Sequence, residues 1–257
     1  MRILAIGDVC GTPGLEFLER NLRKIRRNMS IDFVVVNGEN SNVVGMQPRH
    51  GERMLDAGAD VITLGNHTWA YRDIIEYMDD TNRVIRPANF APQCPGTGYA
   101  IVDTDKGRVC VINLMGRYGL DGNTDNPFPC IEALLEKLEG KADFFVLDFH
   151  AEATSEKRAM GYFLDGRISA VWGTHTHVQT SDVQVLPGGT GYITDLGMTG
   201  PIDSVLGIEI SQSIGKFMGD LPERYRSPKG DCKMEGCIFE IDDQTGACLG
   251  AEAIRIS

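Results

Sequence analysis

The chain has 257 residues, of which 42% are hydrophobic and 24% are charged. This size and composition suit one soluble globular domain, and we expect a single domain over residues 1–257. The formal net charge of −11 argues against stable binding of duplex nucleic acid, because such binders usually present a basic face to the phosphates.

Short apolar runs in the first two-thirds of the chain predict buried strands, and amphipathic helices fall between them. The strands are expected at residues 3–6, 33–36, 61–64, 109–112, 144–147 and 168–172. One apolar face joins Leu15, Leu18, Leu22 and Ile25, and another joins Ile131, Leu134, Leu135 and Leu138. This alternation predicts an α/β fold with largely parallel strands.

The last third has a different pattern. Residues 183–186, 192–194, 234–241 and 248–256 are expected as strands, joined by tight turns such as Gly188-Gly189 and the segment 242–246. We expect these strands to form a second, mixed or antiparallel sheet.

Polar side chains follow five of the predicted strands. Ligands bind beyond the carboxyl ends of the strands in open α/β sheets, so these side chains are expected to meet. In chain order they are Asp8, Glu39 with Asn40, Asn66 with His67, His150, and His175 with His177. Any one of them alone is more typical of a turn or a cap. However, four of the five histidines lie at such strand ends, and only His50 does not.

These side chains form a chemically consistent set of metal ligands. Imidazole, carboxylate and amide oxygens suit divalent ions such as manganese, iron and zinc. The spacing of His175 and His177 suits two adjacent metals, and a carboxylate such as Glu39 can bridge them. Paired metals activate the attacking oxygen and stabilise the leaving oxygen in phosphoryl transfer. No P-loop, dinucleotide-binding or serine-hydrolase motif competes with this interpretation.

Five ordered motifs carry a family resemblance. They are Gly7-Asp8, Gly38-Glu39-Asn40, Gly65-Asn66-His67, His150 and Gly173-Thr174-His175-Thr176-His177. In this order they resemble the signature of calcineurin-like metallophosphoesterases. Three positions depart from the usual pattern. Cys10 replaces a histidine, Glu39 replaces the bridging aspartate, and Thr68 replaces an acid.

These departures, together with residues 148–152 and 194–200, resemble the YmdB-like bacterial branch, which is associated with 2′,3′-cyclic nucleotides. The resemblance implies two mixed β-sheets packed as a sandwich and flanked by helices. It also implies two divalent or mixed-valence metal ions. We expect iron or manganese to be favoured, with zinc or magnesium as possibilities.

The resemblance also divides the ligands between the two metals. One would be held by Asp8, Glu39, Asn40 and His177, and the other by Glu39, Asn66, His150 and His175. Asn40 would stand in for the missing first-motif histidine.

His67 is the expected general acid, and a metal-bridging hydroxide is the expected nucleophile. Because Thr68 replaces the usual acid, another group has to orient His67, for which Asp195 or a backbone carbonyl is a candidate. Asp148 and Glu152 are expected to support the ligand histidines.

The expected function is hydrolysis of small phosphodiesters, 2′,3′-cyclic nucleotides first among them. One alternative is a phosphomonoesterase or a nuclease with the same metal centre, for which Arg49 and Arg117 would be candidate contacts. The other is a non-catalytic regulatory protein that binds metal, although structural metal sites are usually closed.

The cellular setting is predicted from the cysteines and the apolar segments. Seven scattered cysteines without a C-x-x-C pair indicate free thiols in a reducing compartment. No apolar run is long enough for a signal segment or a membrane span, so we expect a cytoplasmic protein. Apolar residues of uncertain partner between positions 201 and 232, with the family resemblance, suggest a homo-oligomer.

Overall fold

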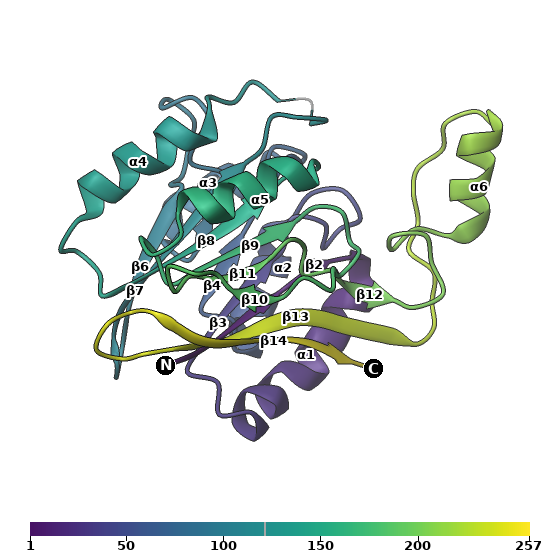
Figure 1. Cartoon of the computed structure of the whole chain (residues 1–257). Helices are drawn as coiled ribbons and strands as arrows, with labels where there is room; N and C mark the ends of the chain where they lie inside the picture. Colours follow the sequence, from purple (N-terminus) through teal and green to yellow (C-terminus); the bar gives the residue numbers. More distant parts are fainter. Residues whose placement is uncertain (121) are drawn as a thin grey trace.

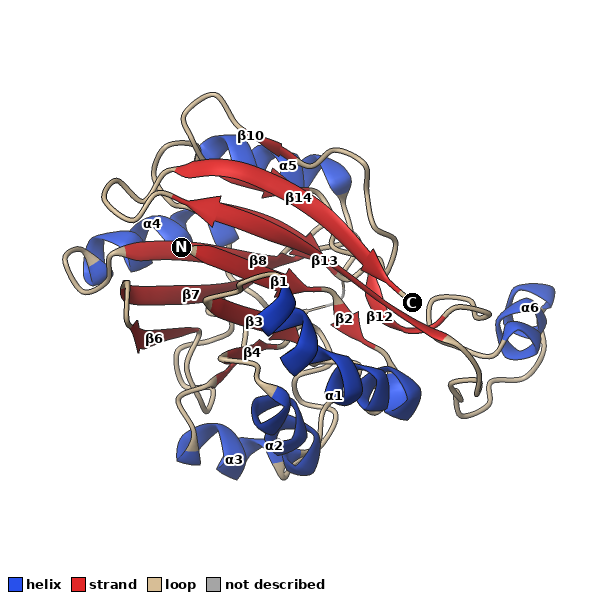
Figure 2. Ribbon diagram, turned by 90° about the horizontal axis from the view of Figure 1, so that it is seen from below, coloured by secondary structure: helices blue, strands red, loops and turns tan. Residues whose placement is uncertain are grey.

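The computed structural model describes residues 1–120 and 122–257. Two β-sheets pack face to face, and helices cover the outer face of each (Figures 1 and 2). The first sheet contains β1 (Arg2–Ile6), β2 (Asp8–Val9), β3 (Phe33–Asn37), β4 (Val61–Thr63), β5 (Val84–Ile85), β12 (Met198–Pro201), β13 (Cys232–Ile241) and β14 (Cys248–Ile256). The second contains β6 (Tyr99–Thr104), β7 (Gly107–Met115), β8 (Phe144–His150), β9 (Ala170–Thr174), β10 (Gln184–Val185) and β11 (Gly191–Ile193).

Six helices are described. They are α1 (Gly11–Asn28), α2 (Pro48–Ala57), α3 (Ile74–Asp80), α4 (Pro127–Leu138), α5 (Thr154–Phe163) and α6 (Ile210–Met218). The apolar sides of α1, α2 and α3 pack on the first sheet, and those of α4 and α5 pack on the second. Pro48 begins α2 at a position where its missing N–H is tolerated.

Both sheets are mixed. In the first, β1, β3, β4 and β5 run parallel, while β13 pairs antiparallel with β1 and with β14. In the second, β7, β8, β9 and β11 run parallel, and β6 and β10 pair antiparallel at the two edges. The predicted sandwich of two mixed sheets flanked by helices is therefore confirmed.

The expected grouping of the late strands was wrong in one respect. They form no separate sheet, because β13 and β14 extend the first sheet while β10 and β11 extend the second. Strand pairing between distant segments depends on contacts between side chains that periodicity along the chain does not reveal. Each sheet therefore combines early and late parts of the sequence.

The strands read as continuous apolar runs because both of their faces are buried. Along β1, Leu4 and Ile6 pack on the helix side, while Ile3 and Ala5 face the other sheet. Between the sheets, the rings of Trp172 and Phe239 stack with centroids 5.8 Å apart. The inner core thus fixes how the two sheets sit on each other.

Residues 202–231 form a segment, here called the arm, that carries α6 away from the sandwich (Figures 1 and 2). Apolar side chains on it are exposed, Phe217 by 85% and Leu221 by 91%. Among the described residues, no helix is both long and apolar enough to cross a bilayer.

Candidate metal centre

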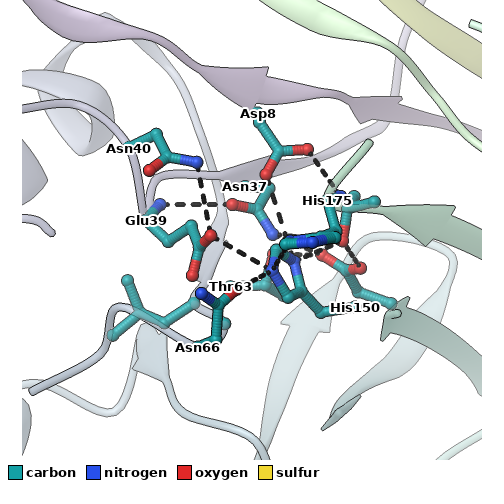
Figure 3. Close-up of polar contacts among 12 residues, drawn as sticks. Asp8, Asn37, Glu39, Asn40, Thr63, Asn66, His150 and His175 are labelled. Carbon is teal, nitrogen blue, oxygen red and sulfur yellow. Dashed lines mark hydrogen bonds and ion pairs between the residues drawn. The ribbon is translucent and has the colours of Figure 1, made fainter. Parts of the chain in front are cut away.

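The predicted ligands come from five strand ends that meet where the two sheets pack. Parallel strands β1, β3 and β4 deliver Asp8, the Glu39–Asn40 pair and Asn66, and strands β8 and β9 of the other sheet deliver the histidines. His150 is the last residue of β8, and His175 and His177 follow β9. Figure 3 shows most of these side chains pointing toward one another.

The Nε2 atom of His150 is the focus of one half of the cluster. It lies 2.9 Å from Asn66 Oδ1, 3.1 Å from Glu39 Oε1 and 3.1 Å from His175 Nδ1. Metal bonds of about 2.1 Å at right angles place neighbouring ligand atoms about 3.0 Å apart. The spacing therefore fits a metal coordination shell, and we call Asn66, His150 and His175 the His150 half.

A hydrogen-bond network fixes the other ring nitrogen of His150. Nδ1 lies 2.9 Å from Thr174 Oγ1, and this hydroxyl donates to Asp148 Oδ1 over 2.7 Å. Because the hydroxyl proton is committed to Asp148, Nδ1 donates to the hydroxyl, which leaves Nε2 as the ring nitrogen that faces the other ligands and that would bind a metal when the ring is neutral. Asp148 is fully buried and also accepts hydrogen bonds from Asn37 and Thr63.

His175 is held in a similar way. Its Nε2 lies 3.1 Å from Glu152 Oε2, while Nδ1 faces His150. Burial lowers the pKa of His175 to about 3, and the neighbouring His150 ring adds to this effect. The ring is therefore neutral at physiological pH, which is the form that binds a metal.

The other half, formed by Asp8, Asn40 and His177 and here called the His177 half, is looser. Asp8 Oδ2 accepts a hydrogen bond from the His175 backbone N–H over 3.2 Å, but Oδ1 has no hydrogen-bond partner among the described residues. That oxygen lies 3.7 Å from His177 Nε2. Burial raises the pKa of Asp8 to about 6, and the nearby histidines offset this only in part. A fully buried carboxylate with an unpartnered oxygen fits a cation ligand.

Glu39 connects the two halves. Its Oε1 contacts His150 and also lies 3.2 Å from Asn40 Nδ2, and its Oε2 accepts a hydrogen bond from the His67 backbone N–H over 3.1 Å. Burial alone would raise the pKa of Glu39, but the adjacent His150 ring lowers it to about 2. Glu39 is thus ionised and placed between the two halves, as a bridging ligand requires.

Asn40 Nδ2 also lies 3.0 Å from His177 Nε2. A half-turn of the amide puts Oδ1 in the same place, and Oδ1 is the atom by which an amide binds a cation.

The loop after β9 has an unusual backbone. His175 and His177 both have positive φ, of 97° and 62°. Such conformations are costly for non-glycine residues and are found mainly where surrounding contacts hold them at functional sites. Here the Asp195 carboxylate accepts hydrogen bonds from the Thr176 N–H and hydroxyl and from Lys157 Nζ, the last over 2.7 Å.

Asp195 therefore supports the histidine loop, and the interactions described for it do not include His67. Its suggested role in orienting His67 is not supported.

Two motif glycines are explained by close packing. A Cβ at Gly65 would overlap Glu39 Oε2 and His150 Nε2, and one at Gly173 would overlap the Thr194 carbonyl. Both positions require a residue without a side chain, because the cluster and the adjoining strand approach the backbone directly.

His67 lies beside the cluster, at a cavity of about 190 Å³. Its ring Nε2 is 3.3 Å from Asn66 Nδ2. Thr68 does not take over the role of the missing acid, because its hydroxyl donates to the Gly65 carbonyl over 2.6 Å and caps the turn. The cavity is lined by Cys10, Glu39, Asn40, Val43, Val44, His67, His175, His177, Leu206, Gly207, Ile208, Tyr225 and Ser227.

Two groups of residues escaped the sequence analysis. Asn37, Thr63 and Thr174 support the ligands from within the strands, and their only sequence signal is polarity in otherwise apolar runs. Tyr225 and Ser227 reach the cavity from the arm, where the run 224–229 holds three basic residues and one aromatic residue. Arg49 and Arg117, the basic candidates from the sequence, do not line this cavity.

The chain is similar to known proteins over its whole length. The family described as YmdB-like protein matches residues 4–254. The 2′,3′-cyclic-nucleotide 2′-phosphodiesterase of Bacillus subtilis is 42% identical, over 100% of this chain and 97% of its own length.

Two crystal structures, a hypothetical protein of Thermus thermophilus and a phosphatase of Mycoplasma pneumoniae, are 36% and 35% identical. Each superposes with a TM-score of 0.92 over 100% of this chain, covering 99% and 93% of the other chain.

Proposed function

The chain belongs to the YmdB-like protein family, and from this premise we propose that it hydrolyses small phosphodiesters, with 2′,3′-cyclic nucleotides as preferred substrates. Membership of the family, expected from the three departures from the usual motifs and from residues 148–152 and 194–200, is confirmed by the match over residues 4–254. The identity of 42% to a phosphodiesterase over the full chain likewise confirms the prediction of a hydrolytic enzyme. The two-metal mechanism, the preferred substrate and the residue roles below are our proposal.

Two cations would be held by the seven clustered ligands. Glu39 would be shared, with Asn66, His150 and His175 completing one site and Asp8, Asn40 and His177 the other. When bound, such ions would lower the pKa of a shared water and withdraw charge from the phosphate oxygens. Oxygen-rich ligands beside imidazoles favour iron or manganese, with zinc or magnesium also compatible.

His67 would donate the proton that the leaving oxygen needs. It borders the cavity, and its backbone N–H is fixed by Glu39 Oε2. The ring is only partly buried, so it can exchange protons with solvent between turnovers. Its position one residue after a ligand keeps the imidazole close to the reacting phosphate without committing it to a metal.

The observation that carries the proposal is the convergence of Asn66, Glu39 and His175 on His150 Nε2, within 3.1 Å, at the edge of an open cavity. A purely structural metal site is usually closed by protein ligands on all sides. The open cavity therefore favours an enzyme over a non-catalytic metal-binding protein.

The proposal is tested by hydrolysis of 2′,3′-cyclic AMP with the purified protein and added manganese, with chromatography of the products. We expect a single adenosine monophosphate, and the isomer formed identifies the P–O bond that breaks. An adenosine 3′-phosphate substrate, assayed in parallel, tests the phosphomonoesterase alternative, for which the Mycoplasma pneumoniae phosphatase is the relevant relative. No turnover of either ester by metal-loaded protein would overturn the proposal.

Three further expectations join the proposal. Residues 1–257 act as a single domain, because strands from both ends of the chain share one inner core. The protein forms a homo-oligomer, because Phe217, Met218 and Leu221 on the arm are at least 80% exposed and would be buried by a second copy. Sedimentation velocity measures this assembly directly. The cytoplasmic location stays a prediction that the seven unpaired cysteines fit.

A further inference from the structure

The cavity beside the metal centre opens into a larger groove. This groove has a volume of about 960 Å³ and shares Val43, Tyr225 and Ser227 with the cavity of about 190 Å³. One wall is the first turn of α1, with Thr12 and Pro13, and the opposite wall is the arm. A ligand seated at the metals can therefore continue into the groove.

The groove is locally basic, in contrast to the chain as a whole. Arg20, Arg224, Arg226 and Lys229 line it, against only two acids, Glu16 and Glu209. Arg226 is paired with Glu209 over 3.2 Å. The ion pairs of the described residues include none for Arg20, Arg224 or Lys229. In a protein with a net charge of −11, three such cations along one groove favour an anionic ligand.

The junction between cavity and groove carries two groups suited to a nucleotide. Tyr225 lines both the cavity and the groove with an aromatic ring on which a base can stack, and Lys216 Nζ lies 5.4 Å from the centroid of this ring. The Ser227 Oγ is buried and has no hydrogen-bond partner among the described residues. An aromatic residue flanked by cations, as Tyr225 is by Arg224 and Arg226, is typical of surfaces that bind single-stranded nucleic acid.

We propose that the substrate is the 3′ end of a single-stranded RNA that terminates in a 2′,3′-cyclic phosphate. The terminal nucleoside occupies the cavity, and the upstream phosphates lie along Arg224, Lys229 and Arg20. This inference rests on the proposed phosphodiesterase function. In a 2′,3′-cyclic nucleotide both of these ribose oxygens are esterified, so the chain can extend as RNA only through the 5′ oxygen, which carries a phosphodiester.

The chemical step is the same for the oligonucleotide and the mononucleotide. The oxygen of one water forms a new bond to phosphorus, one of the two P–O bonds to the ribose breaks, and the released ribose oxygen takes up a proton. The product is a phosphomonoester at the same 3′ end, with the RNA length unchanged. Only binding, through the groove, distinguishes the two substrates.

The kinetic test compares three substrates in manganese buffer. They are adenosine 2′,3′-cyclic phosphate, the same compound with a 5′-phosphate, and a tetranucleotide with a cyclic 3′ end. We expect kcat/KM for the tetranucleotide to exceed that for the mononucleotide at least tenfold at low salt. Single-stranded binding loses about 0.7 in log K per log unit of salt for each neutralised phosphate, so three contacts predict a slope of about −2.

The variant Arg224→Ala/Lys229→Ala tests the groove, and Lys24→Ala/Lys141→Ala is its control. The control removes the same charge from exposed positions outside the groove. We expect the ratio of tetranucleotide to mononucleotide kcat/KM to fall toward 1 in the groove variant and to stay unchanged in the control. An equal fall of this ratio in both variants would overturn the inference, and so would an equal kcat/KM of the wild-type protein for all three substrates. The inference would also fail if the mononucleotide with a 5′-phosphate reached the kcat/KM of the tetranucleotide, because the groove would then recognise one phosphate rather than RNA.

A binding measurement separates the groove from catalysis. Fluorescence anisotropy of a 5′-labelled tetranucleotide with a 3′-phosphate, in EDTA, should show salt-sensitive binding that the groove variant weakens at least tenfold and the control does not. A matching duplex should bind more weakly. If none of the three cyclic substrates is hydrolysed, the proposed function fails and this inference fails with it. If only the tetranucleotide preference is missing, this inference alone fails.

Discussion

The two halves of the metal centre differ in how far the protein alone arranges them. In the His150 half, three donor atoms lie within 3.1 Å of His150 Nε2, and the ring is fixed from behind by Thr174 and Asp148. In the His177 half, Asp8 Oδ1 has no hydrogen-bond partner among the described residues and lies 3.7 Å from His177 Nε2. The first half is ready for a cation, while the second needs one to draw its ligands together.

The difference follows from how the two histidines, His150 and His177, are held. His150 ends a central strand whose neighbours, β7 and β9, hold it on both sides. His177 lies in a loop, and its Nδ1 contacts the Leu206 carbonyl of the arm over 3.0 Å and the Cys10 thiol over 3.4 Å. Ligands on strands are positioned more rigidly than ligands on loops. We therefore expect the His150 half to bind its metal more tightly.

Glu39→Gln should have the largest effect, because this carboxylate serves both halves. The substitution removes the shared negative charge while keeping the shape of the side chain, so both cations should be lost or strongly weakened. Loss of metal assistance should lower kcat by on the order of 10³-fold or more. Metal content by mass spectrometry, measured beside kcat, checks this. Loss of one equivalent of metal with the other retained would show that Glu39 belongs to a single half.

His67→Ala should have the second largest effect on kcat, and it should leave metal bound in both halves. Removal of a general acid typically costs about 10²–10⁴-fold in turnover. A diester with a p-nitrophenyl leaving group needs little protonation, so its hydrolysis should fall much less than that of a 2′,3′-cyclic nucleotide. Equal losses on the two substrates, with metal content unchanged, would remove His67 from the acid role.

Asp148→Asn should weaken one half selectively. Asp148 would act on a bound metal only through Thr174 and His150, and substitutions of such supporting groups typically cost about 10–100-fold in metal affinity. Competition for the metal with a coloured chelator should resolve the binding of two metal ions, and the affinity should fall for the ion that binds more tightly. Asp165→Asn is the matched control, because Asp165 accepts hydrogen bonds from the backbone N–H groups of Gly188 and Thr190, neither of which is a proposed ligand. Weakening of both steps would mean that the halves do not bind independently.

Much of this centre could be predicted from sequence because strand ends carry their own signals. A polar residue after an apolar run marks a carboxyl end, and the structure brings together the seven side chains that follow five such ends. The partition of strands between the sheets could not be predicted, because β13 pairs with β1 across more than 200 residues. The supporting set, Asn37, Thr63 and Thr174, was also missed. Each is a single polar residue within a strand, and its importance depends on side chains from the other sheet.

The smallest effect is expected at His50, the one histidine outside the cluster. It is 2% exposed, and its Nδ1 lies 3.2 Å from the hydroxyl of Ser41, in the loop that carries Glu39 and Asn40. Burial lowers the pKa of His50 from 6.5 to about 4, with Arg49 and Arg53 adding to the effect. The loop shared by the two halves therefore rests on a neutral histidine.

This pKa difference gives the direction of the pH dependence. Below pH 6.5 the unfolded chain protonates His50, while the folded protein keeps it neutral down to about pH 4. The stability that this group contributes is thus present above pH 6.5 and is lost as the pH falls toward 4.

Between pH 7.5 and pH 5 the loss should be roughly 1–2 kcal/mol. His50→Gln keeps a polar group near Ser41 but cannot titrate, so its stability should fall less over the same interval. Urea unfolding of both proteins at the two pH values measures the difference, and the other titrating groups, common to both chains, largely cancel. An identical pH dependence would show that His50 is not held neutral in the folded protein.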